Sequence, residues 1–200
     1  MTARNVNEDR LVWIDLEMTG LDVEKDVIVE IACIVTDAEL ERLDEGIQLV
    51  VFQDEATMEV MDDFVRNMHK KSGLLVEIPT STTSVAAAEA SVIEYIRSHV
   101  DTPGIAPLCG NSIGMDRRFL ARYMPNLDGY LHYRSVDVSS FKEMCRRWYP
   151  DIYRKRPGKS ERHRALGDIR ESIEELRFYR AELFPTRNNT SSPPAESSGS

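Results

Sequence analysis

The first apolar run of the chain reads Leu11-Val12-Trp13-Ile14-Asp15-Leu16-Glu17-Met18-Thr19-Gly20-Leu21, and it decides the predicted fold. Its β-branched and aromatic residues predict a buried strand, yet Asp15 and Glu17 lie at the end of that strand. Residues i and i+2 of a strand point to the same face, so the two carboxylates project side by side. Because like charges repel and each is costly to desolvate, the pair predicts a bound divalent cation such as Mg²⁺ or Mn²⁺, which prefers oxygen ligands. The alternative is that Asp15 merely ends the strand and Glu17 is solvated.

Length and composition indicate one folded domain. At 200 residues, with 42% hydrophobic and 8% aromatic content, the chain can bury a core of its own. We expect a flexible N-terminus over residues 1–9, a single domain over 10–184 and a disordered Ser/Pro-rich tail over 185–200. No apolar run reaches the ~18 residues of a membrane helix, and the polar N-terminus has no secretory signal. We therefore expect a cytoplasmic protein that does not associate with membranes, whose three scattered cysteines form neither disulfides nor a zinc site.

The charge of the chain restricts its partners. A formal net charge of −9 argues against indiscriminate binding to long nucleic acid, which favours basic surfaces. It does not exclude a small phosphate-bearing substrate, because bound metal ions supply positive charge locally. Residues 146–164 are strongly basic, and we expect a loop over 149–164. Such a run is usually a solvated face; as a hypothesis, it assists the approach of a phosphate.

Hydrophobic periodicity predicts strands first and then strands that alternate with helices. Besides the first strand, the predicted strands lie over residues 27–36, 46–52, 105–111 and 133–138. The predicted helices lie over residues 58–69, 84–100, 116–123 and 166–183. This order predicts an α/β fold with a mixed central sheet flanked by helices, in which the first three strands form a meander.

Three more residues can join the two carboxylates of the first strand. Asp116 lies where a predicted strand leads into a helix, a junction that often delivers a side chain to a site. His163 and Asp168 are five residues apart, or about 140° around a helix, so they share a site only if His163 lies on a loop before the helix of Asp168. That division suits a rigid metal ligand and a base on a mobile loop. Taken singly, His163 reads as a surface histidine and Asp168 as a solvated helix residue.

Four stretches of the chain carry a resemblance to a known family. They are residues 13–21 (WIDLEMTGL), 109–120 (CGNSIGMDRRFL), 132–139 (HYRSVDVS) and 163–173 (HRALGDIRESI). In this order they resemble the DEDDh class of 3′-to-5′ exonucleases, which has a ribonuclease H-like fold, and within it the chain looks like the oligoribonuclease family. The resemblance runs from about Leu11 to Phe184 and omits both ends.

The resemblance implies hydrolysis of the phosphodiester at the 3′ end of very short single-stranded RNA, from dinucleotides to about five residues. The products would be nucleoside 5′-monophosphates, and the substrates would include linear products of cyclic dinucleotides. Two divalent cations, Mg²⁺ or Mn²⁺, would bracket the scissile phosphate, and His163 would accept the proton of the attacking water. The implied metal ligands are Asp15, Glu17, Asp116 and Asp168.

The resemblance also implies a set of substrate-binding residues and a homodimer. Leu21 would wedge between the bases, Phe64 would stack on a base, and His69 would contact the substrate, as would Ser112. The partner subunit of the homodimer would cap the 5′ phosphate, which favours a dinucleotide. The cap residues would be Tyr133, Arg134 and Ser139. The alternatives without a role in substrate binding are that Leu21 and Phe64 belong to the core and that Arg134 pairs with a nearby acid.

Two departures from the family pattern stand out. Relatives commonly carry Trp where this chain has Phe64, and often Asp where it has Gly167. The first change reduces the stacking area, and the second loosens the start of a helix without removing an implied ligand. Two other functions stay open: an exonuclease that trims or proofreads longer RNA or DNA, and a non-catalytic binder of short nucleotides.

Overall fold

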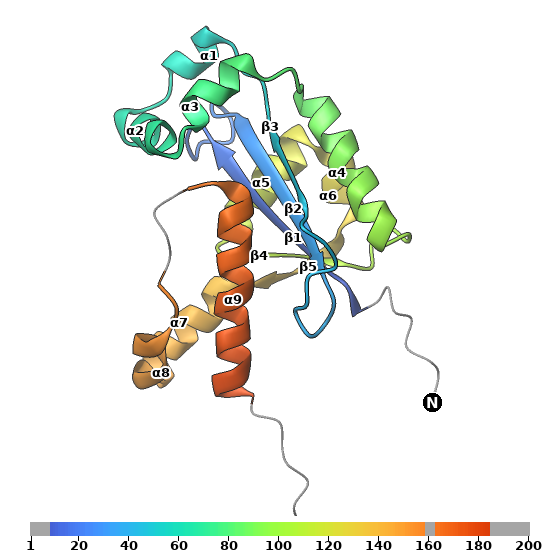
Figure 1. The fold of residues 1–200 in the computed structure, drawn as a ribbon, viewed down its shortest axis with the longest axis vertical. Coiled ribbons are helices and arrows are strands. Elements are labelled where there is room, and N and C mark those ends of the chain that lie inside the picture. Colours follow the sequence, from blue (N-terminus) through green and yellow to red (C-terminus); the bar gives the residue numbers. More distant parts are fainter. Residues whose placement is uncertain (1–8, 159–162, 185–200) are drawn as a thin grey trace, which may run out of the picture.

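The chain forms a five-stranded sheet with helices on both faces (Figure 1). This computed structural model describes residues 9–158 and 163–184. The strands are β1 (Leu11–Met18), β2 (Ile28–Thr36), β3 (Ile47–Val50), β4 (Pro107–Gly110) and β5 (His132–Asp137). The helices are α1 (Glu55–Glu59), α2 (Asp63–Ser72), α3 (Leu74–Glu77), the 3₁₀ helix η2 (Ile78–Thr80), α4 (Val85–His99), α5 (Gly114–Tyr123), α6 (Pro125–Tyr130), α7 (Val138–Trp148), α8 (Pro150–Lys155) and α9 (Ala165–Leu183).

The domain boundaries stay predictions. The expected flexible N-terminus, apart from Asp9, and the expected tail over 185–200 lie outside the described residues. Within the described ranges, every helix is too short or too polar to cross a membrane.

The sheet is mixed, as the order of elements predicted, and its strand order is β3-β2-β1-β4-β5. β1, β2 and β3 form the predicted antiparallel meander, whereas β4 and β5 run parallel to β1. β1 is therefore the central strand, with a neighbour on each side. The carboxyl ends of β1, β4 and β5 meet at one edge of the sheet, where α/β proteins commonly place their sites.

Alternate residues of β1 pack against different helix layers because successive side chains of a strand point to opposite faces. Ile14 belongs to the core under α4, α5 and α6, together with Ile96 and Phe119. Trp13 belongs to the core under α7 and α9, together with Ile173. In Figure 1, α9 crosses one face of the sheet and α4 the other. Asp15 and Glu17, which share the face of Trp13, are thereby directed toward the side covered by α9.

Two predicted segments differ from the structure. The helix predicted over 58–69 is two helices, because Asp62 interrupts it as the N-cap of α2 and accepts a hydrogen bond from the Val65 N–H at 2.8 Å. α2 extends beyond the predicted end at residue 69 to Ser72, and Gly73 then adopts a left-handed conformation. The loop expected over 149–164 contains helix α8, which begins with Pro150 in the first turn, a position that suits proline.

The buried carboxylate of Glu89 on α4 holds the start of α6 in place. Its Oε1 accepts hydrogen bonds from the N–H groups of Asn126 (2.7 Å) and Leu127 (3.0 Å), the otherwise unsatisfied donors at the start of α6. We expect Glu89→Ala to lower the free energy of unfolding by about 2–3 kcal/mol, because it leaves buried donors without an acceptor. Denaturant unfolding measures this loss. The control is Glu94→Ala, an exposed position of the same helix, expected to change stability by less than about 0.5 kcal/mol; equal losses in both variants would contradict the assignment.

Candidate active site

Asp15 and Glu17 lie on the same face of β1, as the strand periodicity predicted. Glu17 is only 7% exposed and Asp15 is half-buried, while β1 continues to Met18. The alternative that Asp15 ends the strand and Glu17 is solvated is therefore wrong. Neither residue is free to turn away, because β1 is hydrogen-bonded to β2 through Asp15 opposite Ala32 and Glu17 opposite Glu30.

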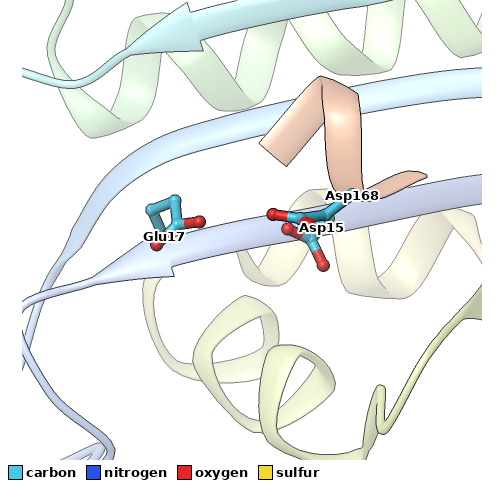
Figure 2. Close-up of side chains that lie close together, drawn as sticks. All are labelled: Asp15, Glu17 and Asp168. Carbon is cyan, nitrogen blue, oxygen red and sulfur yellow. The ribbon is translucent and has the colours of Figure 1, made fainter. Parts of the chain in front are cut away.

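Asp168 completes a group of three carboxylates. It lies in the first turn of α9 and reaches across to the two acidic residues of β1 (Figure 2). One carboxylate oxygen from each of Asp15, Glu17 and Asp168 lies within 4.8 Å of the others. Residues separated by more than 150 positions in the sequence thus meet at one point, and hard divalent cations prefer an all-oxygen set of this kind.

Asp116 approaches the same strand from the opposite helix layer. It lies in the first turn of α5, is 7% exposed, and its Oδ1 accepts a hydrogen bond from the Leu16 N–H at 3.1 Å. That N–H lies beyond the last residue of β1 that pairs with β4, so Asp116 takes the place of a strand partner. Its carboxylate is therefore held against the backbone between Asp15 and Glu17, beside the group of three.

Burial and mutual repulsion perturb these carboxylates. Burial, followed by the charges of Asp168, Glu30 and Asp116, raises the pKa of Glu17 to about 8, and Arg164 opposes this. Burial raises the pKa of Asp116 to about 6, against the hydrogen bonds from backbone N–H groups that favour its charged form. Within the described part of the chain, Glu17 and Asp116 are thus short of compensating positive charge. A bound cation would supply it, and the donor chemistry of the cluster fits one.

His163 lies immediately before α9, separated from it by Arg164, as the five-residue spacing required. It is exposed and adopts a positive φ of 43°, which side chains rarely favour. A small pocket joins it to α2, lined by Phe64, Asn67, Met68, Lys71 and His163. His163 is thus accessible to solvent, and it shares this pocket with Phe64.

His69 is fully buried. Its Nε2 lies 2.8 Å from the Met18 carbonyl oxygen and so carries the proton, while its Nδ1 lies 3.8 Å from Glu17 Oε2. Burial lowers the pKa of His69, although the hydrogen bond to the Met18 carbonyl and the charge of Glu30 oppose this. The contact that the structure shows is with a presumed metal ligand, and a direct contact with substrate stays a prediction.

Leu21 and Phe64 are exposed, by 64% and 78%, so the alternative that they are core residues is wrong. Leu21 follows β1 in a tight loop in which Asp26 accepts hydrogen bonds from Thr19 Oγ1 (2.9 Å) and the Asp22 N–H (2.8 Å). A Cβ on Gly20 would lie 2.4 Å from the Asp26 carboxylate, which explains the glycine before Leu21. Phe64 lies in the first turn of α2.

Ser112 and Ser139 are joined by a residue that the sequence analysis did not single out, Asp137 at the end of β5. Its Oδ1 accepts hydrogen bonds from the N–H groups of Ser112 (2.9 Å) and Ser139 (2.9 Å) and from Ser139 Oγ (2.6 Å). Ser112 is exposed and has a positive φ of 61°. The β4–α5 loop that precedes Asp116 is thereby fastened to the start of α7.

Tyr133 and Arg134 lie away from the carboxylates of β1 and α9. They are exposed on β5, the edge strand, where the Arg134 guanidinium lies 5.3 Å from the centre of the Tyr133 ring. From the pairing of Val12 with Leu108 and of Leu108 with Ser135, we place them roughly 15–20 Å from Glu17. Among the described residues, no carboxylate forms an ion pair with Arg134, so the alternative that it pairs with a nearby acid is wrong for this part of the chain.

Glu30 and Arg164 are the main residues that sequence reasoning missed. Glu30 is fully buried in β2, opposite Glu17, and binds Arg164. A signal was present, because a charged residue inside the apolar run of residues 27–36 is the same anomaly that marked Asp15 and Glu17.

Known proteins resemble this chain in sequence. A family model described as "Exonuclease" (RNase_T) matches residues 12–176. The oligoribonuclease of Mycobacterium bovis is 56% identical over 177 residues, which cover 88% of this chain and 82% of that protein. The oligoribonuclease of Streptomyces coelicolor is 57% identical over 176 residues, which cover 88% of each protein.

Solved structures resemble it in fold. E. coli exonuclease I in complex with a dA16 oligonucleotide has a TM-score of 0.68 at 15% identity, over 88% of this chain and 41% of that one. Exonuclease I from Methylocaldum szegediense has a TM-score of 0.57 at 19% identity, again over 88% and 41%. The chain thus spans about two-fifths of the length of these exonucleases, and the likeness confirms the predicted ribonuclease H-like α/β fold. By its family match and its relatives, the chain belongs to the exonuclease family and, within it, to the oligoribonucleases, the metal-dependent 3′-to-5′ exoribonucleases of short RNA.

Proposed function

We propose that this protein removes nucleotides from the 3′ end of RNAs of two to about five residues and releases nucleoside 5′-monophosphates. The observation that carries the proposal is the group of Asp15, Glu17 and Asp168, whose oxygens lie within 4.8 Å of one another. His163, which is exposed, immediately precedes Arg164 and the helix α9 that carries Asp168. Substrates of this length include linear dinucleotides produced from cyclic dinucleotides.

Two divalent cations, Mg²⁺ or Mn²⁺, are the proposed cofactors. Asp15, Glu17 and Asp168 would hold them together with Asp116, which the Leu16 N–H keeps at the same strand. When bound, the ions activate water and neutralise the charge that develops on the leaving 3′ oxygen. The raised pKa values of Glu17 and Asp116 support this role, because carboxylates that repel one another in a buried site gain most from a cation.

His163 is the proposed general base. Its exposed position lets its imidazole accept the proton of the attacking water and return it to solvent. Leu21 and Phe64 would hold the bases of the substrate, since both present exposed apolar side chains on which a base can stack. His69 and Ser112 are proposed to assist in binding the substrate, His69 from beneath Met18, whose carbonyl oxygen it binds.

A homodimer would bring the 5′-phosphate cap to the site. Tyr133 and Arg134 lie too far from their own carboxylates to contact a dinucleotide bound there, whereas a partner subunit can present them, together with Ser139. An apolar groove of about 580 Å³ lies between α7, which comes directly after β5 in the sequence, α8 and the end of α9. Trp148 and Phe184 in this groove are more than 60% exposed, which is typical of an interface.

Two further features bear on the proposal. The three buried, free cysteines suit a reducing, cytoplasmic location. The E. coli exonuclease I in the comparison holds a longer oligonucleotide, but its likeness to this chain concerns the fold alone. The complete set of four carboxylates and His163 favours catalysis over the alternative of a non-catalytic nucleotide binder.

Initial rates against RNA length test the proposed substrate. With Mn²⁺ present, we expect the rate to fall at least about tenfold between a dinucleotide and a ten-residue RNA, because a 5′ cap leaves no room for longer chains. Asp15→Asn and a chelator are each expected to lower the rate on the order of 10²–10³-fold or more. Rates that do not vary with length would contradict the cap, and turnover by Asp15→Asn would contradict the site.

The pH dependence of stability tests the electrostatics of the carboxylates. In the metal-free protein, folded Glu17 keeps its proton up to about pH 8, whereas unfolded Glu17 loses it near its ordinary pKa of 4.5. The folded state therefore binds more protons between these pH values, and stability falls as the pH rises from 4.5 to 8, by at most about 5 kcal/mol. Thermal unfolding of the metal-free protein measures this slope.

Glu17→Gln is the matched variant for that measurement. In this variant, stability should no longer fall with pH above about pH 6. The smaller fall at lower pH that is due to Asp116, whose folded pKa is about 6, should remain. Mg²⁺ or Mn²⁺ should raise the unfolding temperature more at pH 8 than at pH 5, because protons compete with the metal. An unchanged slope in Glu17→Gln would show that Glu17 does not hold the proton.

Subunit complementation tests whether the cap is supplied in trans. We expect Arg134→Ala to lower kcat/KM for a 5′-phosphorylated dinucleotide by about 10–100-fold, as for loss of a charged hydrogen bond. Asp15→Asn should be inactive. Mixing the two variants after dissociation should restore about a quarter of wild-type activity, because half of the dimers then combine one intact set of carboxylates with one intact cap. No gain on mixing would show that Arg134 acts within its own subunit or not at all.

A further inference from the structure

Arg164 connects three elements around the proposed active site. Its Nε and Nη2 lie 2.9 Å and 2.7 Å from Glu30 Oε1 on β2. Its Nη1 and Nη2 lie 2.8 Å and 3.0 Å from the two carboxylate oxygens of Glu77 on α3, a bidentate pair. Arg164 itself is the residue before α9, so one guanidinium joins β2, α3 and the start of α9.

The inner anchor, Glu30, is fully buried and completely engaged. Besides Arg164, its Oε1 accepts a hydrogen bond from Gln48 Nε2 at 2.6 Å, and its Oε2 accepts one from the Ala165 N–H at 2.9 Å. The side chain of Arg164 makes no capping hydrogen bond to α9. The Glu30 carboxylate, which comes from strand β2, caps the helix instead. The position of the first turn of α9, which carries Asp168, is therefore fixed relative to β2.

The ring of His163 has no comparable support. In the part of the chain that the structure describes, no hydrogen bond holds its imidazole, and its backbone lies in the sparsely populated left-handed region. The placement of the ring therefore depends on the backbone to which it is attached. On the C-terminal side, that backbone is Arg164, whose side chain is held at both ends of the guanidinium.

We infer that Arg164 is a positioning residue for His163, and that Glu30 and Glu77 form the clamp that holds it. The inference rests on the proposed role of His163 as the base. Through Glu77, the clamp also joins His163 to helices α2 and α3. Because α2 carries Phe64, the clamp fixes the position of His163 relative to Phe64. A planar guanidinium can bridge two carboxylates in this way, whereas a lysine ammonium cannot reproduce the bidentate contact.

Glu77 is the anchor to change, because its side chain is 45% exposed and its removal leaves Glu30 paired with Arg164. With a dinucleotide and Mn²⁺, we expect Glu77→Gln to lower kcat about tenfold while KM changes less than about threefold, since a misplaced base slows the chemistry rather than the binding. Arg164→Lys should behave similarly. The matched control is Glu45→Gln, which breaks an ion pair of 2.8 Å with Arg170 on the same helix α9 and should leave kcat within twofold.

The deciding measurement repeats Glu77→Gln in a His163→Ala background. If the clamp acts through His163, the second substitution has no further effect on the residual rate, whereas independent effects would multiply. An equal fall in both backgrounds, or full activity of Glu77→Gln and Arg164→Lys in the wild-type background, would overturn the inference and leave the function intact. Wild-type activity of His163→Ala would instead overturn the role of His163 as the base. Thermal unfolding of each variant shows that the changes in rate are measured on folded protein.

Discussion

Asp15, Glu17 and Asp168 bring like charges within 4.8 Å of one another, and burial removes much of the water that would screen them. Most of the fold can be understood as the framework that makes this contact possible. β1 holds its two carboxylates in place because it pairs with β2 on one side, while on the other side the Leu16 N–H donates a hydrogen bond to Asp116. Burial and then the repulsion between neighbouring carboxylates raise the pKa of Glu17 to about 8, and both make a bound cation favourable.

Three hydrogen-bond systems keep the charged groups where they are. Asp116 is held by the Leu16 N–H, the loop before Asp116 is held by Asp137, and the start of α9 is held by Glu30. Each uses a carboxylate to accept backbone N–H groups that a strand or helix end leaves without a partner. The carboxylates of this chain, whose formal net charge is −9, thus hold the structure together as well as forming the proposed metal site.

The two departures from the family pattern have different consequences in this framework. Phe64 is exposed beside His163, so a smaller ring at this position changes the stacking surface directly. Gly167 lies in the exposed first turn of α9, where a Cβ would meet no atom within 4 Å. A glycine there is therefore not required by packing, and the helix start that it loosens is instead secured by Glu30 and Arg164.

The sequence alone determined the α/β class, the meander, and the placement of Asp15 and Glu17 on one face, because strand periodicity and apolar composition are local properties. It also placed His163 before the helix of Asp168, since helix geometry leaves no other way to bring them together. Only the tertiary structure decided that Glu30 lies opposite Glu17, that Arg164 joins it to Glu77, and that His69 is buried against Glu17. These contacts join residues up to 134 positions apart, and they depend on strand register and on the packing of helices against the sheet, which no local pattern contains.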